Sequence, residues 1–585
     1  MSPNANVTQS LKAAATTLKV DGIWIPSSDA HLSEYNGGTN NLREVLTGFT
    51  GSMGDAVYVL SQNQIHLAID GRYHLQADRE CGNRSEIVLH KADSAADIIP
   101  FLRRELEKQS CRTIGVPASR LSAALYLDLE KSGFKLAPIS ESQLLSFFGP
   151  IGFEGPKHVF QIRTVPEIFV GVSLAKQLQK FRTAIAAATG GKSYLYHTNA
   201  SDDAAYLLVS RSYAIPCQSS FLASVFLTSE KVFVLFDSTA NVLSVPDDWA
   251  ACGVEYFADE QKFLEQLRQQ SADVIVSHPA FMNSYWPKKI ADLFPKAIAQ
   301  EWTGLMEWRA RKNPQEQAAF RDSFLRSSRA IAKTLRWAMD ASANGVISER
   351  DLANKIDTEY RAEGAVGLSF RTIAGFAENS AVVHYGACSP DVKSRPGDLV
   401  LLDSGAYYDA GFATDCTRGF VVRGAAPQDW QKKIYTTCLK SAIQVFLKPV
   451  MKAWNGREVD AFVRTPILAA GWNYLHGTGH GVGILVHEEG VRFSPASNYA
   501  QKDTAVVSVE PGIYLTGQGG VRVENVVILH EQDQAFEYEN LVFVGYDWNL
   551  VDVDALTENE KNHLRLYERR CRELGTAITD CPLGL

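Results

Sequence analysis

The hydrophobic residues in the first part of this chain fall into short runs, separated by turns and by amphipathic stretches. The runs Ala56–Leu60, His66–Ile69 and Ile87–Leu89 are short and mostly apolar, and they predict strands. Over residues 95–108 the apolar positions follow the helical period instead, which predicts a helix. This alternation indicates a mixed α/β domain that ends at the Gly- and Pro-containing linker 148–156.

A second segment with the same kind of alternation follows this linker. The pattern predicts a helix over Val172–Ala188 and then strands at 193–196, 223–227, 232–236 and 273–276, the last of which closes the segment. No repeat of fixed short period is visible along the chain. Whether the two α/β segments are distant copies of each other stays open at this point.

The third segment opens with a strong helix-start signal. In Asn313-Pro314-Gln315-Glu316 an N-cap Asn is followed by Pro at the first helical position and Glu at the third. Ser348 starts another helix that ends at Gly364, and the chain is then rich in strands up to a charged, mostly solvated helix over 557–575. The predicted domains are therefore 1–152, 153–308 and 309–585, in a chain of mixed α/β and α+β class.

Two acidic residues interrupt the apolar strands predicted over residues 508–525. Glu510 and Glu524 lie on opposite sides of a Gly-rich turn predicted at 516–520. The two-residue period of a strand puts Arg522 and Glu524 on one face. A buried acid costs free energy unless a cation, a metal or water compensates it. A hairpin with one solvated face is the simpler interpretation, but two acids on neighbouring apolar strands favour a metal site.

The composition is that of an ordinary globular protein, and it narrows the classes of function. Hydrophobic residues make up 45% and charged residues 21% of the 585 residues. The net charge of −8 is spread without a basic block, which argues against nucleic acid as the main partner. No apolar run is long enough for a membrane span, and no secretory signal is visible. Nine scattered cysteines without a CxxC pair indicate reduced thiols in a cytoplasmic protein.

Two further acids stand near the ends of a second predicted hairpin. The apolar run 399–402 leads into Asp403, and Asp415 follows twelve residues later, with a turn predicted at 409–411. The hairpin would bring the two carboxylates side by side. Aspartates in such places are more often turn formers or caps, so this pair alone does not define a metal site.

Histidines and glycines gather in the segment 476–483. His476 and His480 lie among four glycines, and His487 follows shortly afterwards. So many glycines rule out a stable helix and allow close approach of the backbone to a neighbour, and imidazoles suit a divalent metal or a substrate. A flexible loop with incidental histidines is the alternative. His384 follows another apolar run, where a lone His is more often a satisfied core residue.

All these candidates lie in the third predicted domain. Four carboxylates in one pocket cannot all stay ionised without cations, because like charges at close range repel. Two divalent ions would relieve this repulsion and would supply a shared hydroxide as nucleophile. Oxygen-rich ligation with one imidazole favours Mn²⁺ or a similar borderline ion such as Zn²⁺ or Co²⁺. The predicted chemistry is hydrolysis.

The order and wording of these motifs resemble a known family. The five candidates Asp403, Asp415, His480, Glu510 and Glu524 are similar in order to the ligand set of the pita-bread metallopeptidases. The surrounding sequence motifs most resemble those of aminopeptidase P, the Xaa-Pro aminopeptidases. They include His476-Gly-Thr-Gly-His-Gly-Val-Gly483 and Val521-Arg-Val-Glu-Asn525. The words at 26–31, 70–73 and 550–557 resemble its long, three-domain form. The resemblance implies two creatinase-like α/β domains followed by a pita-bread catalytic domain.

The resemblance also implies a role for each residue. Asp415 and Glu524 would bridge two metal ions, Asp403 would hold one of them, and His480 and Glu510 would hold the other. Glu510 would also carry the proton during attack on the carbonyl before proline.

Roles around the ligands are implied as well. His384 and His487 would bind the substrate and the intermediate, and His476 would shape the proline side of the pocket. Arg522 would orient the acids, and Tyr514 would hydrogen-bond nearby. The implied substrates are peptides with proline at the second position, and a homodimer is expected.

Some features depart from the family pattern, and other functions stay open. The Asn-Leu-Arg-Gly type of word expected in the middle domain reads Val209-Ser210-Arg211-Ser212 here, which leaves the preferred peptide length undecided. A prolidase-type dipeptidase is the second enzymatic interpretation. A pita-bread protein that binds peptides without metal is the third, but it would be favoured by loss of a ligand, and all five are present.

Overall fold

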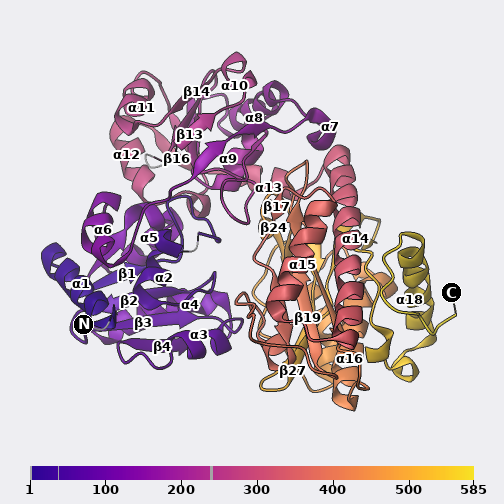
Figure 1. Cartoon of the computed structure of the whole chain (residues 1–585). Coiled ribbons are helices and arrows are strands. Elements are labelled where there is room, and N and C mark those ends of the chain that lie inside the picture. Colours follow the sequence, from indigo (N-terminus) through magenta and orange to yellow (C-terminus); the bar gives the residue numbers. More distant parts are fainter. Residues whose placement is uncertain (1–2, 37, 238–240, 585) are drawn as a thin grey trace. The chain divides into compact units, whose positions relative to one another are not determined.

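A computed structural model of the chain describes residues 3–36, 38–237 and 241–584, which form two compact units (Figure 1). The first unit comprises the described residues up to Thr164 together with Val172–Ile215 and Ser220–Leu305. The second comprises Val165–Gly171, Pro216–Ser219 and the chain from Met306 onward. The predicted domain boundaries at residues 152 and 308 stay predictions.

The first unit contains two six-stranded sheets. The first sheet has the order β4-β3-β2-β1-β5-β6 and consists of β1 (Gly22–Ile25), β2 (Asp55–Val59), β3 (Gln64–Ile69), β4 (Ile87–Lys91), β5 (Thr113–Pro117) and β6 (Lys135–Ile139). The second has the order β14-β12-β11-β9-β15-β16 and consists of β9 (Tyr194–Thr198), β11 (Ala223–Leu227), β12 (Val232–Phe236), β14 (Val254–Phe257), β15 (Val274–Ser277) and β16 (Ile298–Glu301).

The two sheets have the same topology. In chain order, both follow the pattern 4-3-2-1-5-6. In both, the first strand pairs antiparallel with the second, and the second antiparallel with the third. The other neighbours pair in parallel. The relationship that the sequence left open is therefore visible in the strand order and direction. The prediction that strand 273–276 closes the second segment is wrong, because β16 follows it as a largely exposed, polar edge strand with little hydrophobic signal.

Helices accompany both sheets at matching points of the chain. Those of the first segment are α1 (Pro3–Leu18), α2 (Leu42–Thr47), α3 (His74–Cys81), α4 (Ile98–Lys108), α5 (Ala123–Lys131) and α6 (Glu141–Phe148). Those of the second are α8 (Leu174–Ala188), α9 (Ser201–Leu207), α10 (Asp248–Ala251), α11 (Glu260–Leu267) and α12 (Tyr285–Leu293). Two short strand pairs complete the unit, β7 (Val159–Gln161) with β13 (Asn241–Ser244) and β8 (Arg163–Thr164) with β10 (Ser210–Arg211).

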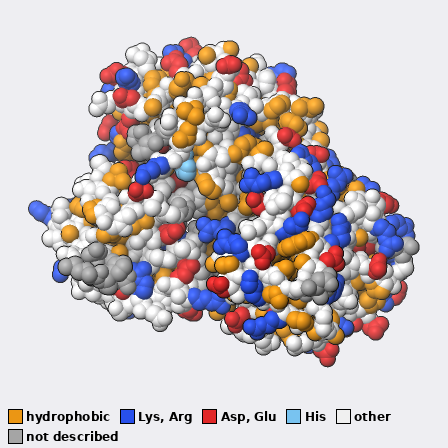
Figure 2. Space-filling model, viewed as in Figure 1, with side chains coloured by type: hydrophobic (Ala, Val, Ile, Leu, Met, Phe, Trp, Pro, Cys, Tyr) orange, Lys and Arg blue, Asp and Glu red, His pale blue; other side chains and the backbone are white. Residues whose placement is uncertain are grey.

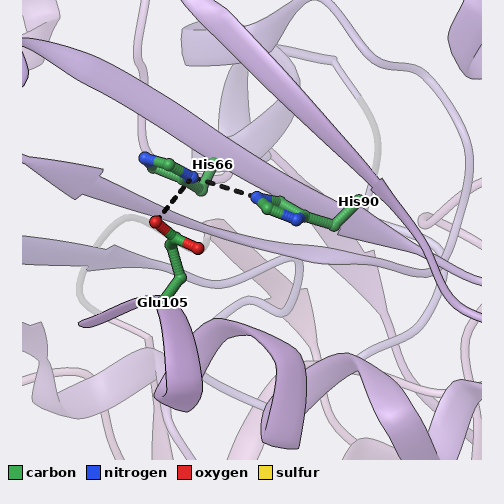
Figure 3. Close-up of side chains that lie close together, drawn as sticks. All are labelled: His66, His90 and Glu105. Atoms are coloured by element: carbon green, nitrogen blue, oxygen red, sulfur yellow. Dashed lines mark hydrogen bonds and ion pairs between the residues drawn. The ribbon is translucent and has the colours of Figure 1, made fainter. Parts of the chain in front are cut away.

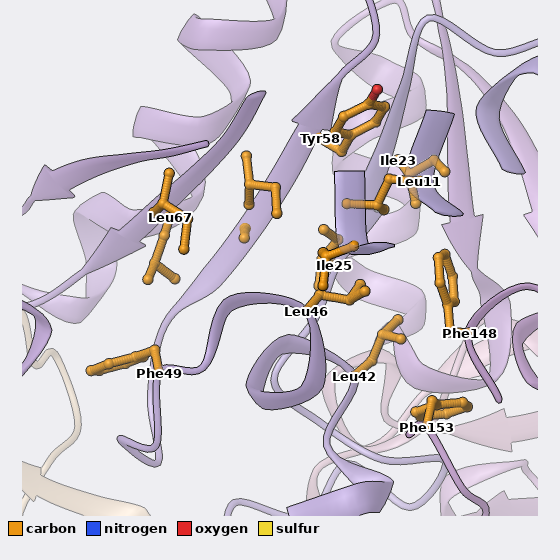
Figure 4. Close-up of a cluster of buried hydrophobic side chains, with 14 of the residues drawn as sticks. Leu11, Ile23, Ile25, Leu42, Leu46, Phe49, Tyr58, Leu67, Phe148 and Phe153 are labelled. Carbon is orange, nitrogen blue, oxygen red and sulfur yellow. The ribbon is translucent and has the colours of Figure 1, made fainter. Parts of the chain in front are cut away.

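The core of the first sheet includes a helix that the sequence pattern did not predict. Figure 4 shows Leu11 of α1 close to Ile23 of β1, and these residues belong to one buried cluster with Leu42, Leu46 and Phe148. Much of the buried side of α1 consists of small alanines, so its hydrophobic stripe is weak in the sequence. Burial of the larger residues of this cluster stabilises the sheet by about 1.5–3 kcal/mol per side chain.

The second unit combines mixed sheets with long helices. Its strands form the sheets β18-β19-β21 and β22-β29-β28-β25-β23-β24 and the pairs β26-β27 and β17-β20. Their bounds are β17 (Gly367–Leu368), β18 (Ile373–Phe376), β19 (Leu399–Ser404), β20 (Ala406–Tyr407), β21 (Cys416–Val421), β22 (Val450–Met451), β23 (Gly479–Gly481), β24 (Glu488–Phe493), β25 (Val506–Val509), β26 (Gly512–Leu515), β27 (Gly519–Arg522), β28 (Asn525–Glu531) and β29 (Ala535–Asn540). Its helices are α7 (Glu167–Val170), α14 (Pro314–Asn344), α15 (Glu349–Ala362), α16 (Asp429–Leu447), α17 (Gly456–Ala469) and α18 (Glu558–Glu573), and α13 (Gly304–Ala310) lies at the junction of the two units.

The two helix starts predicted in this unit are confirmed. Oδ1 of Asn313 accepts a hydrogen bond from the Glu316 amide at 3.0 Å, and Oε2 of Glu316 accepts one from the Asn313 amide at 2.8 Å. Ser348 makes the same reciprocal cap with Asp351. The tail helix α18 is charged and largely exposed as predicted, but one side of it, including Leu564 and Tyr567, belongs to a buried cluster of this unit.

The surface shows no separation of charge on the face seen in Figure 2, where Lys and Arg side chains are interspersed with Asp and Glu, in line with the small net charge. Among the described residues, none of the helices has both the length and the apolar character required to cross a membrane.

One buried carboxylate organises the segment that leads to His384. Glu349 at the start of α15 is fully buried and accepts four hydrogen bonds. Its donors are the amides of Phe376 (3.0 Å) and Ser389 (3.1 Å), Nδ2 of Asn379 (2.9 Å) and the hydroxyl of Tyr385 (2.8 Å). These bonds satisfy the carboxylate and tie down the chain on both sides of His384.

Replacing this carboxylate should therefore be costly. We expect Glu349→Ala to lower the free energy of unfolding by about 3 kcal/mol, because four buried donors lose their partner. Asp357→Ala on the same helix is the matched control, since Asp357 forms only an exposed ion pair with Arg361 and should change stability by less than about 0.5 kcal/mol. Denaturant unfolding of both variants measures the difference, and equal losses would contradict this account of Glu349.

Candidate metal centre

Asp403 and Asp415 meet as the predicted hairpin requires. β19 and β21 pair antiparallel, with Asp403 opposite Thr417 and Ser404 opposite Cys416. Asp415 comes directly before β21. Both carboxylates are buried, with 9% and 7% of their side chains exposed. Two acids that are far from a turn and largely buried are not acting as turn formers.

Glu510 and Glu524 were predicted to lie within two strands, but the structure places each of them in a break between strands. Each acid falls in a two-residue break, Glu510 between β25 and β26 and Glu524 between β27 and β28. β25 pairs with β28 and β26 with β27, so the breaks face each other in one long ribbon. The turn is also shorter than predicted, because Gly519 and Gly520 belong to β27.

These breaks have one local cause and one that involves residues distant in the sequence. Pro511 has no N–H to contribute to a strand ladder. The amide of Glu510 instead donates to the carbonyl of Thr478 at 2.8 Å, and the amide of Glu524 donates to the carbonyl of Thr417 at 3.3 Å. Each acid is thus held by a different segment of the chain.

The glycines around His480 allow close packing against the protein itself. A Cβ on Gly479 would lie 1.9 Å from the carbonyl oxygen of Ser508, and one on Gly483 would lie 1.8 Å from Oε2 of Glu488. The close approach that the glycine content predicted is therefore made to strand β25 and to a neighbouring carboxylate. It places His480, in the middle of β23, next to the acids of the ribbon.

The five predicted ligands come together in this unit. Nε2 of His480 lies 3.3 Å from Oε1 of Glu510 and 3.5 Å from Oδ2 of Asp415. Asp415, His480 and Glu524 each offer a ligand atom, and these atoms lie within 4.8 Å of one another. Asp403 joins the group through Arg522, which contacts both Asp403 and Glu510.

Arg522 is the buried cation of the cluster, with 2% of its side chain exposed. Its Nη2 donates to Oδ2 of Asp403 at 2.5 Å, its Nε donates to the Thr417 hydroxyl at 2.9 Å, and its Nη1 donates to the Tyr514 hydroxyl at 2.8 Å. The Thr417 hydroxyl in turn donates to Oε2 of Glu524 at 2.8 Å. One guanidinium therefore fixes two of the acids, one directly and one through Thr417.

The three other predicted histidines lie at the edge of this group. Nε2 of His476 lies 2.9 Å from the Tyr514 hydroxyl, and its Nδ1 lies 3.9 Å from Oε2 of Glu510. The ring of His487 meets that of His480 edge-on, with centroids 4.3 Å apart. His384 is half-buried and follows Val383, whose carbonyl accepts a hydrogen bond from Nη1 of Arg522 at 3.3 Å.

Sequence reasoning missed several residues that hold this arrangement. Thr417 is one, although its position opposite Asp403 is a signal that strand register can supply. Asp460 and Arg464 of α17 are two more. Oδ1 of Asp460 accepts from the Thr478 hydroxyl at 2.6 Å, and Nη2 of Arg464 donates to the carbonyl of His476 at 2.6 Å. These hydrogen bonds hold the Gly-rich segment 476–483 against α17. The sequence signal for the two residues is an acid and a base four residues apart on one helix.

The negative charges of the four carboxylates outweigh the positive charge of Arg522 beside them. Burial, and then the negative charges of Glu524, Asp403 and Glu510, raise the pKa of Asp415 well above its ordinary value. Burial, and then Glu510 and Asp403, raise the pKa of Glu524 in the same way, against the opposing effect of Arg522. Without further cations, the two carboxyls retain protons at a pH where exposed acids have lost theirs.

The side chains present fit divalent metal ions. Oδ1 of Asp403 is buried and receives no hydrogen bond from any described residue, although Oδ2 of the same carboxylate is well satisfied. A buried carboxylate oxygen without a protein donor costs free energy unless a cation or water compensates it, and the neighbouring carboxylates favour a cation here. Four carboxylates with a single imidazole form an oxygen-rich donor set, which suits borderline and hard divalent ions.

Two protein-family descriptions match parts of the chain. Residues 322–531 match the model of metallopeptidase family M24, and residues 8–144 match the model of the creatinase/prolidase N-terminal domain. The chain is 29% identical to human Xaa-Pro aminopeptidase 2 over 595 residues, covering 97% of this chain and 85% of that protein. It is 27% identical to the probable Xaa-Pro aminopeptidase P of Neosartorya fischeri over 560 residues, covering 90% and 82%.

A solved structure has the same fold over nearly the whole chain. It is the X-prolyl aminopeptidase of Caenorhabditis elegans, described as a cytosolic enzyme with a di-nuclear active site. The TM-score is 0.85, the identity is 23%, and the match covers 98% of this chain and 96% of that one. With the two family matches, this likeness agrees with the predicted creatinase-type and pita-bread architecture. The chain is thus similar to Xaa-Pro aminopeptidases over nearly its whole length, and it has the fold of an X-prolyl aminopeptidase.

Proposed function

We propose that the chain is a metal-dependent Xaa-Pro aminopeptidase, which hydrolyses the bond between the first residue of a peptide and a proline at the second position. The observation that carries this proposal is the group formed by His480, the buried carboxylates of Asp403, Asp415 and Glu524 and the half-buried carboxylate of Glu510, in which Oδ1 of Asp403 has no donor among the described residues. The relatives named Xaa-Pro aminopeptidase over nearly the full length of the chain support the choice of substrate.

We assign two divalent ions to the five residues, with Mn²⁺ as the first choice and Zn²⁺ or Co²⁺ as alternatives. Asp415 and Glu524, at the centre of the group, would contact both ions. Asp403 would hold one ion, and His480 and Glu510, 3.3 Å apart, would hold the other. When bound, such a pair of ions would supply Lewis acidity and a water activated for attack at neutral pH.

Glu510 is the residue that we assign to proton transfer. Its side chain is 17% exposed, compared with 9% for Asp403 and 7% for Asp415, so it is the carboxylate best placed to reach a bound peptide. Its Oε1 faces His480, and its Oε2 lies 3.9 Å from both His476 and Arg522. A carboxylate between cationic or polarisable neighbours can accept a proton from attacking water and deliver it to the departing amine.

The histidines at the edge of the group are assigned to the substrate. His487 and His384 are half-buried and would contact the carbonyl that is attacked. His476 and Tyr514 would line the proline side, held by the hydrogen bond between them. Arg522 is a positioning residue, because it contacts Asp403, Thr417 and Tyr514 rather than the peptide. A proline nitrogen carries no N–H, so this pocket must recognise the residue by shape.

Cellular location and assembly are further parts of the proposal. A reducing compartment such as the cytoplasm suits the nine cysteines, all of which are free thiols. The Caenorhabditis elegans relative is described as cytosolic, which agrees with this location. The homodimer expected from the resemblance stays a prediction.

The reaction is tested with purified protein and added Mn²⁺ on three substrates. We expect release of arginine from Arg-Pro-Pro, slower or no cleavage of the dipeptide Gly-Pro, and no cleavage of a control tripeptide without proline. Cleavage of Gly-Pro alone would assign a prolidase instead. A protein that binds Arg-Pro-Pro without cleaving it, in any of the three metals, would contradict the proposed enzyme.

The repulsion between the acids predicts an unusual stability profile for the metal-free protein. Because the pKa values of Asp415 and Glu524 are raised, the folded state holds protons that the unfolded chain, with pKa values of about 4, has already released. Stability of the metal-free protein therefore falls as the pH rises above about 4. We expect Asp415→Asn to raise the melting temperature in chelator at pH 8, to leave it unchanged near pH 4, and to abolish activity.

Thermal unfolding of both proteins in chelator across pH 4–8 measures this effect. Added Mn²⁺ should stabilise the wild type more than the variant, because the ions replace the protons. A variant that is less stable than the wild type by the same amount at every pH would contradict the proposed crowding of charge.

The role of Arg522 is tested by a change that keeps its charge. We expect Arg522→Lys to lower kcat/KM by about 10–100-fold and to weaken metal binding, because lysine cannot bond Asp403, Thr417 and Tyr514 at once. Arg492→Lys on β24 is the matched control, since Arg492 is exposed and its ion pair with Glu489 is one that lysine can keep. Metal titrations separate positioning from folding. A lowered melting temperature with unchanged metal affinity would mean that Arg522 is merely structural.

A further inference from the structure

A second group of metal-ligating side chains lies in the first unit, far along the sequence from the residues assigned above. His66 of β3, His90 of β4 and Glu105 of α4 converge on one point, as Figure 3 shows. Nδ1 of His66 is 3.0 Å from Nε2 of His90 and 4.0 Å from Oε1 of Glu105. One ligand atom from each residue lies within 4.8 Å of the other two.

The strand register explains why these side chains meet. β3 and β4 run parallel with His66 paired to Val88, so His90 lies two residues beyond that partner, on the same face. This face packs against α4, whose Leu102 and Leu106 bury themselves in the same cluster as Ala68. Glu105 follows Leu102 by three residues, about 60° around the helix from it, so it flanks this apolar face, and its carboxylate lies beside the histidines (Figure 3).

The tautomer of His66 is set by a residue on the far side of its ring. Nε2 of His66 lies 2.7 Å from Oε1 of Gln62, which can only accept a hydrogen bond, so Nε2 carries the proton. The lone pair of Nδ1 is then directed at His90 and Glu105. A ring nitrogen that donates to an amide oxygen while the other nitrogen stays free is the usual arrangement of a metal-binding histidine.

The orientation of Glu105 and the charge state of His66 also suit metal ligands. Nε2 of Gln109 donates to Oε1 of Glu105 at 3.0 Å, which orients the carboxylate without neutralising it. His66 is buried, and this burial lowers its pKa to about 4, so the imidazole is neutral at physiological pH. The contact between His66 and Glu105 is therefore not an ion pair. Glu105 does pair with the exposed Lys108, whose Nζ lies 3.6 Å from Oε2, whereas Oε1 is the oxygen that faces His66.

The second sheet of the same unit serves as an internal comparison. Phe233 of β12 pairs with Glu255, and Phe257 lies two residues beyond that partner, the same relation that His66 has to His90. Phe263 from the following helix α11 packs against both rings, with centroid distances of 6.4 and 5.9 Å. The topology thus accepts three apolar rings at this place, so the fold alone does not require two imidazoles and a carboxylate there.

We propose that His66, His90 and Glu105 form a binding site for one zinc ion, with a water in the fourth position. Two histidines and one glutamate are an established donor set for Zn²⁺. A tetrahedral ion with bonds of about 2.0–2.1 Å separates two ligand nitrogens by about 3.3 Å, close to the 3.0 Å seen here. Binding moves the His90 proton to its Nδ1 and draws Glu105 inward by a small rotation.

Such a site would connect three elements that are otherwise joined by strand pairing, by apolar contacts and by the polar contacts of His66 with His90 and Glu105. β4 is the edge of its sheet, and its burial is only partial. A zinc ion held by β3, β4 and α4 would fix this edge to the helix that covers it. Binding to the folded state alone would raise the melting temperature with increasing zinc concentration.

The test counts zinc in the full-length protein. After equilibrium dialysis against low micromolar Zn²⁺, we expect three zinc ions per chain in the wild type, two in Glu105→Gln, and one in Asp415→Asn/Glu524→Gln. Glutamine keeps the size of Glu105 and a polar contact to Gln109 but removes the carboxylate. Zinc affinity at the third site should fall at least about 100-fold in Glu105→Gln, since losing even a partner of a ligand costs about 10–100-fold.

Two controls make the outcome decisive. His278→Gln changes a histidine of the first unit outside the cluster and should leave three ions, and peptidase activity should be unchanged in both Glu105→Gln and His278→Gln. His66→Gln provides a second removal of the site, with its folding checked by circular dichroism. Two zinc ions in the wild type, or three in both Glu105→Gln and His66→Gln, would overturn the proposal and leave the group as a hydrogen-bonded pair of histidines.

Discussion

The catalytic unit depends on placing four carboxylates, three of them buried, around the buried guanidinium of Arg522. Arg522 binds Asp403 directly and reaches Glu524 through Thr417. Burial and mutual repulsion raise the pKa of Asp415 and Glu524, so the surrounding fold must hold groups that would otherwise separate. The strand pairs β19–β21 and β25–β28 and the Gly-rich segment supply this restraint from three directions. The repulsion between these carboxylates lowers the free energy of unfolding of the metal-free protein, and bound cations would remove that repulsion.

Much of this arrangement was predictable from sequence because its signals are local. The apolar run before Asp403 and the spacing to Asp415 define a hairpin, and the cap at Asn313 defines a helix start. The four acids and the His- and Gly-rich segment were found because such residues are unusual in apolar strands, whereas the choice of His480 as the fifth ligand came from the family resemblance. The breaks at Glu510 and Glu524 were not predicted, since the partner of the Glu510 amide is Thr478, a residue distant in sequence. Thr417 was missed for a related reason, because its importance follows from strand register and not from its own type.

The first unit shows the limits of reading a sequence for repeats. The two sheets share strand order and direction, yet their residues differ enough that no repeat was visible. Burial selects for apolar size and not for identity, so topology persists while side chains change. The face that holds His66 and His90 in one sheet holds Phe233 and Phe257 in the other. Edge strand β16 and helix α1 were missed because their hydrophobic stripes are short or built from small residues.

The backbone hydrogen bond between Glu510 and Thr478 couples the motions of two metal-ligand candidates, Glu510 and His480. His480 is two residues from Thr478, and its own amide donates to the hydroxyl of Ser508, two residues before Glu510. Two hydrogen bonds therefore join the segment 478–480, which carries the imidazole, to the segment 508–510, which carries the carboxylate. Thermal displacement of one strand must carry the other with it, and the gap between the two donor atoms would vary less than the position of either.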